Sequence, residues 1–280
     1  ARKSADIEYH SKNLIANVAE VKPVHRLKTE KQEETVKLLI LGWNHHISAL
    51  INELCTYKHE YYHITIVAVY PKEKRELELQ DLINVSDRVQ WHHIEADYVK
   101  ETVLKSINPS IFDNVLLVSS ERILEKEEAD ARTIVGFVLL EEVLDNAVKK
   151  PRILLELSDP DNEMLLRKYK SEAIISPLIL SNRLAGTALQ RELNSIFREL
   201  FTVGGAEIIF RTPKEYDIKT SEMSFAELEE KALMYGETAL GFYNDNEEIH
   251  HSLKLRLNPE RKEKIKIKPV TKFVVLTTVY

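Results

Sequence analysis

The sequence lacks the cysteines of a disulfide-stabilised protein. It has 280 residues and a single cysteine, Cys55, so an intrachain disulfide is excluded, which fits a reducing compartment. Cys55 lies inside an apolar helical pattern. We therefore expect a buried structural thiol there rather than a nucleophile.

Long hydrophobic runs are also missing. A bilayer-spanning helix needs about 18 consecutive apolar residues, whereas the longest runs here are Val36–Trp43 and Ile134–Leu140. No signal-peptide pattern opens the sequence, and it does not begin with methionine. We therefore expect a fragment or a processed chain, and any membrane domain of the protein is expected to lie outside this sequence.

The sequence has no excess of positive charge. It contains 39 Lys and Arg against 45 Asp and Glu, which gives a formal net charge of -6 and a pI near 6.0. Binding to nucleic acid requires a basic surface that neutralises phosphates, so we expect no nucleic-acid partner. Hydrophobic residues make up 44% of the chain, and this suffices for a large core in one or two lobes.

Short apolar runs alternate with helical patterns from residue 36 to residue 175. Strands are predicted at 36–41, 64–69, 89–94, 112–119, 153–157 and 173–175. Helices are predicted at 47–54, 71–83, 99–107, 126–148 and 160–169. This alternation predicts an α/β fold, a Rossmann-like, doubly wound parallel sheet covered on both faces.

The pattern changes after Pro177, and the sequence divides into four parts. Residues 1–35 are interpreted as a connector, 36–179 as the Rossmann-like lobe, 180–203 as one long amphipathic crossover helix, and 204–280 as a smaller α+β lobe. Strands of this second lobe are predicted at 207–211, 239–243, 253–257 and 273–279. Its helix at 224–235 begins with Ser224 and Glu227, spaced as in a capping box.

The loop after the first strand carries a degraded dinucleotide motif. In such a sheet, ligands bind at the carboxyl ends of the strands. The motif needs glycine at positions 42, 44 and 47, but the residues are Gly42, Asn44 and Ile47, and the second strand does not end in the acid that binds a ribose. These departures disfavour NAD. The helix that begins near His45 still offers backbone amides to an anion.

Hydroxyl and carboxylate side chains follow the fourth and fifth strands. Ser119, Ser120 and Glu121 come after the fourth, and Glu156, Asp159 and Asp161 surround the end of the fifth. Carboxylates on one rim suit a Ca²⁺-like ion. The alternative is that Ser158 or Asp159 caps the helix that starts at Pro160, which accounts for one acid but not for all of them.

Three histidine pairs occur, at positions 45–46, 92–93 and 250–251. Adjacent side chains of a strand point to opposite faces and do not form one zinc site, so structural or surface roles are expected. His45 and His46 are the exceptions, because they lie at the mouth of the predicted cleft.

No nucleophile–base pair, Walker loop or zinc-protease motif is found. We therefore expect no enzyme.

Four segments carry a family likeness. They are Leu39-Ile40-Leu41-Gly42-Trp43, Ala129-Asp130-Ala131-Arg132, Glu156-Leu157-Ser158-Asp159 with Asn162-Glu163, and Leu257-Asn258-Pro259. In this order and spacing they resemble the RCK (regulator of K⁺ conductance) domain of the Castor/Pollux/DMI1 family of cation channels. The likeness covers about residues 36–280.

The resemblance implies a domain on the cytoplasmic face of a membrane, linked through residues 1–35 to a pore outside this chain. Such domains assemble as a homo-oligomer, expected here to be a tetrameric gating ring in which 180–203 is an assembly surface. Asp130, Glu156 and Asp159 match motif positions. On this basis we expect a cation ligand such as Ca²⁺ at Glu156, Asp159, Asp161, Asp130 and Glu121, and a wider ligand-binding edge at Gly42, Asn44, His45, His46, Ser119, Ser120 and Arg132.

Two other functions remain open from the sequence. One is a nucleotide-binding regulatory subunit of a Trk/Ktr-type K⁺ uptake system, and the other is an NAD(P)-dependent oxidoreductase. The degraded glycine motif and the missing ribose acid count against both. They count more strongly against the oxidoreductase, which also lacks an evident acid or base.

Overall fold

The computed structural model describes residues 34–57, 60–82, 85–120, 126–166, 169, 172–201, 205–244 and 255–278. These residues form two compact units, which divide between Asn194 and Ser195. Most of the predicted connector, Glu121 and the histidine pair at 250–251 lie outside the described residues. Within these ranges, no helix is long and apolar enough to cross a membrane.

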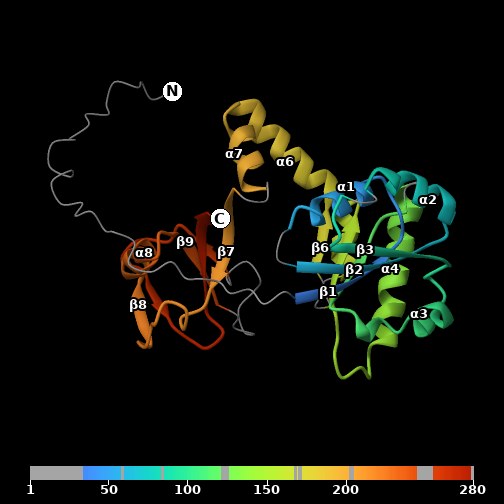
Figure 1. The fold of residues 1–280 in the computed structure, drawn as a ribbon. Helices are drawn as coiled ribbons and strands as arrows, with labels where there is room; N and C mark the ends of the chain where they lie inside the picture. Colours follow the sequence, from blue (N-terminus) through green and yellow to red (C-terminus); the bar gives the residue numbers. More distant parts are fainter. Residues whose placement is uncertain are drawn as a thin grey trace. The chain divides into compact units, whose positions relative to one another are not determined.

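The first unit is built on a parallel sheet with the strand order β3-β2-β1-β4-β5-β6 (Figure 1). The strands are β1 (Glu34–Leu41), β2 (Glu60–Ala68), β3 (Val89–Glu95), β4 (Asn114–Leu117), β5 (Arg152–Leu157) and β6 (Glu172–Ile175). The order reverses between β1 and β4, which is the switch point of a doubly wound sheet. The predicted Rossmann-like fold is confirmed.

Helices pack on both faces of this sheet. They are α1 (His46–Leu54), α2 (Lys72–Leu79), α3 (Glu101–Ile107), α4 (Lys126–Val143) and α5 (Glu163–Leu166), with short 3₁₀ turns η1 (Gln80–Leu82), η2 (Pro109–Ile111) and η3 (Pro160–Asn162). Alternate residues of β1 point to opposite faces. Leu39 and Leu41 join the core under α3 and α4, whereas Ile40 joins the core under α1 and α2.

Cys55 follows α1 and is only half-buried, beside the core under α1 and α2. Burial raises the pKa of its thiol. The thiol is therefore less ionised than an exposed one, which fits the predicted structural role, although the side chain is less buried than expected.

The crossover is two helices and not the single helix predicted at 180–203. Helix α6 spans Ser176–Leu189, α7 spans Leu193–Leu200, and Gln190 between them has the extended backbone angles φ -141° and ψ 101°. Helix α6 also begins earlier than expected, because Pro177 occupies its first turn, where proline loses no backbone hydrogen bond. Neither glycine nor proline marks the interruption at Gln190, so the apolar pattern alone did not reveal it.

The second unit contains an antiparallel sheet in the order β10-β9-β12-β7 and a two-stranded sheet β11-β8 (Figure 1). The elements are β7 (Ala206–Arg211), β8 (Glu222–Ser224), α8 (Phe225–Met234), β9 (Thr238–Tyr243), β10 (Leu255–Leu257), β11 (Lys264–Lys266) and β12 (Lys272–Thr278). The predicted capping box is present at the start of α8, where the Ser224 hydroxyl accepts from the Glu227 amide. The α+β lobe is thus confirmed, and β8 and β11 are additions to it.

Candidate functional site

The carboxylate of Glu156, near the end of β5, connects three segments of the first unit. Its Oε2 accepts a hydrogen bond from Asn44 Nδ2 at 2.7 Å, and its Oε1 accepts one from Ser176 Oγ at 2.8 Å. Oε1 also lies 2.8 Å from Nδ1 of His46. The Glu156 side chain is 13% exposed and that of His46 is 51% exposed. One nearly buried acid therefore joins the loop after β1 to the first residue of α6.

The loop after β1 requires glycine at position 42. Gly42 has a φ of +106°, and a Cβ atom there would lie 2.5 Å from the carbonyl oxygen of Val118. Residues with a side chain rarely adopt this conformation, and none would allow so close an approach without a shift of the Val118 backbone. Next to it, Asn44 is buried, and its Oδ1 accepts from the amide of His46 at 3.0 Å. The first turn of α1 is thus hydrogen-bonded by the chain's own side chain.

Asp130 of α4 is fully buried and holds the turn after β5. Its carboxylate accepts from the amides of Ser158 and Asp159, each at 2.9 Å, and from Nδ2 of Asn162 at 2.9 Å. Within the same turn, Asp159 accepts from the amide of Asp161 at 3.0 Å and caps η3. The capping role weighed for Asp159 is confirmed, and Asp130 is a second acid engaged by backbone amides.

The predicted Ca²⁺ ligands do not converge on one point in the structure. Among the described residues, no group of three or more His, Cys, Asp or Glu side chains is arranged to hold a metal ion. Glu156, Asp130 and Asp159 accept hydrogen bonds from protein donors, and Asp161 is exposed. A cation at this edge would have to compete with these donors. The predicted ligand set stays a prediction.

A second polar group lies after β3 and β4. Ser119 and Ser120 are buried, and the Ser119 hydroxyl has no hydrogen-bond partner among the described residues. Arg132 of α4 donates to Asp97, which follows β3, and its guanidinium lies 5.0 Å from the ring centre of Tyr98. Burial raises the pKa of the Tyr98 hydroxyl. Sequence reasoning did not identify Asp97, although an acid two residues beyond a strand end was the available signal.

A buried cation near the ends of β2 and β3 was also missed. Arg75 of α2 is fully buried and donates to the carbonyls of Ile66 and Ile94, at 3.3 and 3.2 Å. Its Nη1 lies 3.2 Å from Nδ1 of His93. Burial and the neighbouring charge of Arg75 lower the pKa of His93 to about 4. This geometry fits the structural role expected for the pair at 92–93.

The remaining predicted ligand-binding residues sit at the same edge of the first unit. His45 precedes α1, its ring centre 3.9 Å from that of His46, and both side chains are exposed. The structure thus brings Asn44, His46 and Glu156 into direct contact. Ser119 and Arg132 belong to the group after β3 and β4, whereas the Ser120 hydroxyl lies beside Gly42, 3.3 Å from the place that a Cβ would take there.

Several known proteins resemble this chain in sequence or in fold. No family model matches the chain. The chain is 22% identical over 265 residues to the probable ion channel POLLUX of Oryza sativa subsp. japonica, which covers 82% of this chain and 27% of that protein. It is 24% identical over 276 residues to the ion channel CASTOR of Lotus japonicus, covering 86% of this chain and 32% of that protein. Over most of its length the chain is therefore similar in sequence to proteins named as Castor and Pollux ion channels.

The resemblance stated from the sequence motifs is therefore confirmed. The fold is also that of the human SLO3 gating ring, with a TM-score of 0.61, 13% identity, and coverage of 87% of this chain and 44% of that one. The chain spans about a third or less of the length of the two channel relatives.

Proposed function

We propose that the chain is the cytosolic ligand-sensing domain of a cation channel, attached to a pore outside this sequence, and not an enzyme. The likeness to proteins named as ion channels and the gating-ring fold support the class of protein. The hydrogen bonds of Glu156 support the mechanism, because they connect the predicted ligand-binding loop to α6.

Ligand binding would be coupled to the crossover helix α6 through the hydrogen bonds that Glu156 would lose. A ligand changes the balance of two conformations only through its different affinity for each. A cation that takes the oxygens of Glu156 competes with Asn44 Nδ2 and Ser176 Oγ for the same lone pairs. Binding would release the start of α6 from the end of β5. The bound and unbound states then differ at the first turn of the crossover.

We propose Ca²⁺ as the first ligand to test, because the acids of this edge are hard oxygen ligands. Within the predicted set, we single out Glu156, because loss of its hydrogen bonds would free both the loop after β1 and the start of α6. Asp130 is the least available, since its hydrogen bonds to backbone amides hold the turn itself. Asp159 and Asp161 lie on that turn and are exposed.

We further propose that the chain assembles with copies of itself, in a ring expected to be tetrameric. Helix α6 leaves a row of large apolar side chains uncovered, including Leu180 at 57% and Leu184 at 61% exposure. Packing against the same helix of a second copy would bury them. Multi-angle scattering with size exclusion measures the assembly, and a strictly monomeric chain with or without Ca²⁺ would contradict the ring.

The ligand is tested by thermal unfolding with Ca²⁺, Na⁺, K⁺, NAD and ATP, because a ligand that binds only the folded state raises its melting temperature. We expect Ca²⁺ to raise the melting temperature of the parent chain, and Glu156→Gln to lose that rise. Glu142→Gln is the matched control, because Glu142 is exposed on α4, and it should keep the full response. Stabilisation by NAD alone would favour the nucleotide-binding alternative, and an unchanged Ca²⁺ response in Glu156→Gln would remove this residue from the site.

A further inference from the structure

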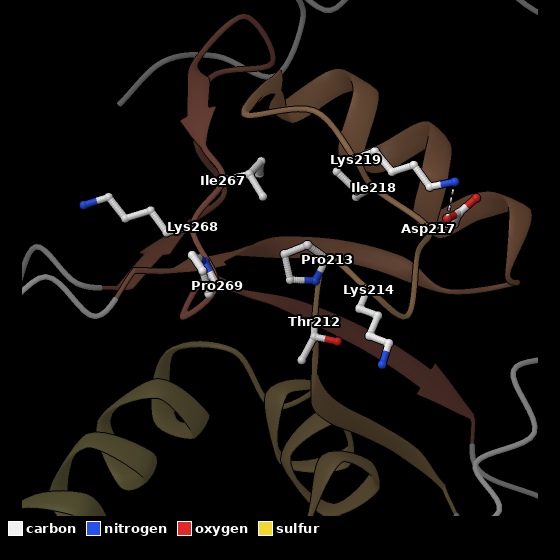
Figure 2. A pocket seen from close by; sticks show the side chains of 9 residues that line it. All are labelled: Thr212, Pro213, Lys214, Asp217, Ile218, Lys219, Ile267, Lys268 and Pro269. Atoms are coloured by element: carbon white, nitrogen blue, oxygen red, sulfur yellow. Dashed lines mark ion pairs between the residues drawn. The ribbon is translucent and has the colours of Figure 1, made fainter.

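The second unit contains a pocket that the proposed gating mechanism does not use. Its volume is about 500 Å³, within the range of small-molecule sites. It is an open depression between two loops, one after β7 and one between β11 and β12 (Figure 2). The lining residues are Thr212, Pro213, Lys214, Asp217, Ile218, Lys219, Ile267, Lys268 and Pro269.

The loop after β7 is fixed by a buried network of charges. Glu215 accepts from the amide and the hydroxyl of Thr212, at 2.6 and 2.7 Å, and from Arg211 at 3.2 Å. Arg211 also forms a buried ion pair with Glu237 at 2.5 Å. Tyr216, fully buried in the same loop, donates to Glu237. One wall of the pocket is therefore held in place without a ligand.

The opposite wall is fixed by hydrogen bonds of its own. The amide of Ile267 donates to the carbonyl of Ser221 at 2.9 Å. The amide of Lys268 donates to the Thr271 hydroxyl at 2.9 Å, and the amide of Thr271 donates back to the Lys268 carbonyl at 3.0 Å. A pocket with two fixed walls loses little conformational entropy when it binds a ligand.

The pocket combines an apolar centre with a basic rim. Figure 2 shows the rings of Pro213 and Pro269 and the side chains of Ile218 and Ile267 around the middle, with the lysine amino groups at the outside. Three lysines and one aspartate line it, so the lining carries a net positive charge. The aspartate, Asp217, already pairs with Lys219 at 3.2 Å.

We propose that this pocket binds a small organic anion, with an apolar ring-sized body between the prolines and isoleucines and a phosphate or carboxylate held at the lysine rim. The apolar body is favoured by the surface that it buries. The anionic group is favoured because lysine ammonium groups on flexible stems reach a phosphate as point charges. The site is in the second unit, so the inference does not depend on the Glu156 site.

The test uses 2-naphthyl phosphate as the probe, with binding followed by its fluorescence polarisation on the full chain. Neutral 2-naphthol and inorganic phosphate are the two comparison ligands, each carrying one half of the proposed chemistry. We expect the probe to bind saturably and at least about tenfold more tightly than either comparison ligand, with weaker binding at higher salt. Equal affinity for 2-naphthol would overturn the anionic requirement, and equal affinity for inorganic phosphate would overturn the apolar one.

Variants of the rim locate the binding and test its sign. Lys214→Ala combined with Lys268→Ala should weaken the probe by about twofold to tenfold, the range for exposed charge pairs. Asp217→Asn should tighten it by about twofold, and asparagine tolerates the positive φ of 48° at this position. Lys262→Ala is the matched control, because Lys262 is exposed in the same unit but does not line the pocket. Affinity that is the same in all four chains, with unchanged unfolding midpoints, would place the probe elsewhere and overturn the proposal.

Discussion

Replacement of Asp130 by asparagine separates the structural role of this acid from a role in binding a cation. The two side chains have the same shape, so the change leaves no cavity. The carboxylate now accepts from the amides of Ser158 and Asp159 and from the side chain of Asn162, all within 3.1 Å. An asparagine keeps one acceptor oxygen and presents an NH₂ group to the remaining donor.

The size of the effect follows from these contacts. A hydrogen bond to a charged acceptor contributes about 1.5 to 3 kcal/mol and one to a neutral acceptor about 0.5 to 1.5 kcal/mol. Three such contacts made neutral therefore cost roughly 3 kcal/mol. A buried amide is cheaper to desolvate than a buried carboxylate, which offsets part of this. We expect Asp130→Asn to lower the free energy of unfolding of the first unit by about 2 kcal/mol.

The assay is urea unfolding followed by tryptophan fluorescence. Trp43 and Trp91 are the two tryptophans of the sequence, and both belong to the first unit, so the signal reports that unit alone. Asp161→Asn is the control, because Asp161 is exposed, and it should change stability by less than about 0.5 kcal/mol. An Asp130→Asn chain that unfolds like the parent, but has lost a Ca²⁺-induced rise in melting temperature, would refute the structural role.

Three further predictions concern buried groups elsewhere. The folded state keeps the pKa of His93 near 4, below the ordinary 6.5, so the unfolded chain takes up a proton at His93 first as the pH falls. This group should therefore contribute at most roughly 3 kcal/mol to the loss of stability between pH 6.5 and pH 4 in urea titrations, and His93→Gln should reduce the loss by that share. Glu237→Gln removes the charge of the closest partner of the buried Arg211 and should destabilise the second unit by about 3 to 5 kcal/mol. Hydrogen exchange in β7 and β12 should become faster, while the unfolding transition followed by tryptophan fluorescence is unchanged. Gly136→Ala should lower the melting temperature despite the better helix propensity of alanine, because its Cβ would lie 2.4 Å from the ring of Tyr98; an unchanged or higher melting temperature would show that the ring yields.

Hydrophobic periodicity was sufficient to predict the sheet of the first unit. Residues 39–41 of β1 and 66–68 of β2 are buried, so these strands read as continuous apolar runs between helical patterns, whereas the edge strand β3 alternates buried and more exposed residues. The short strands β8 and β11 were missed because each has three residues, and only Met223 and Ile265 are buried in them. One buried residue between two that are exposed or partly exposed does not form a recognisable pattern.

The sequence predicted that the candidate site residues lie at one edge of the sheet but did not predict which of them contact each other, and their role in binding a ligand stays a prediction. Parallel topology brings the ends of β1, β4 and β5 together, so Asn44 and Glu156 could be assigned to one edge although 112 positions separate them. The sequence could not show whether the acids there face each other or the backbone. Asp130 and Asp159 accept from backbone amides, a choice made by the local path of the turn after β5.

The sheet keeps the layout of a dinucleotide-binding fold, but the loop after β1 departs from a dinucleotide-binding loop. The contacts of its own side chains explain this departure. Gly42 is kept because Val118 leaves no room for a Cβ, which is a packing requirement independent of any ligand. At the second glycine position, Asn44 directs its oxygen to the amide of His46 and its nitrogen to Glu156. An anion at the start of α1 would have to displace that oxygen and would then approach the Glu156 carboxylate, which repels it. A cation would be attracted to that carboxylate but would compete with Asn44 and Ser176 for its oxygens. The charge of Glu156 therefore disfavours an anion at the switch point of the sheet.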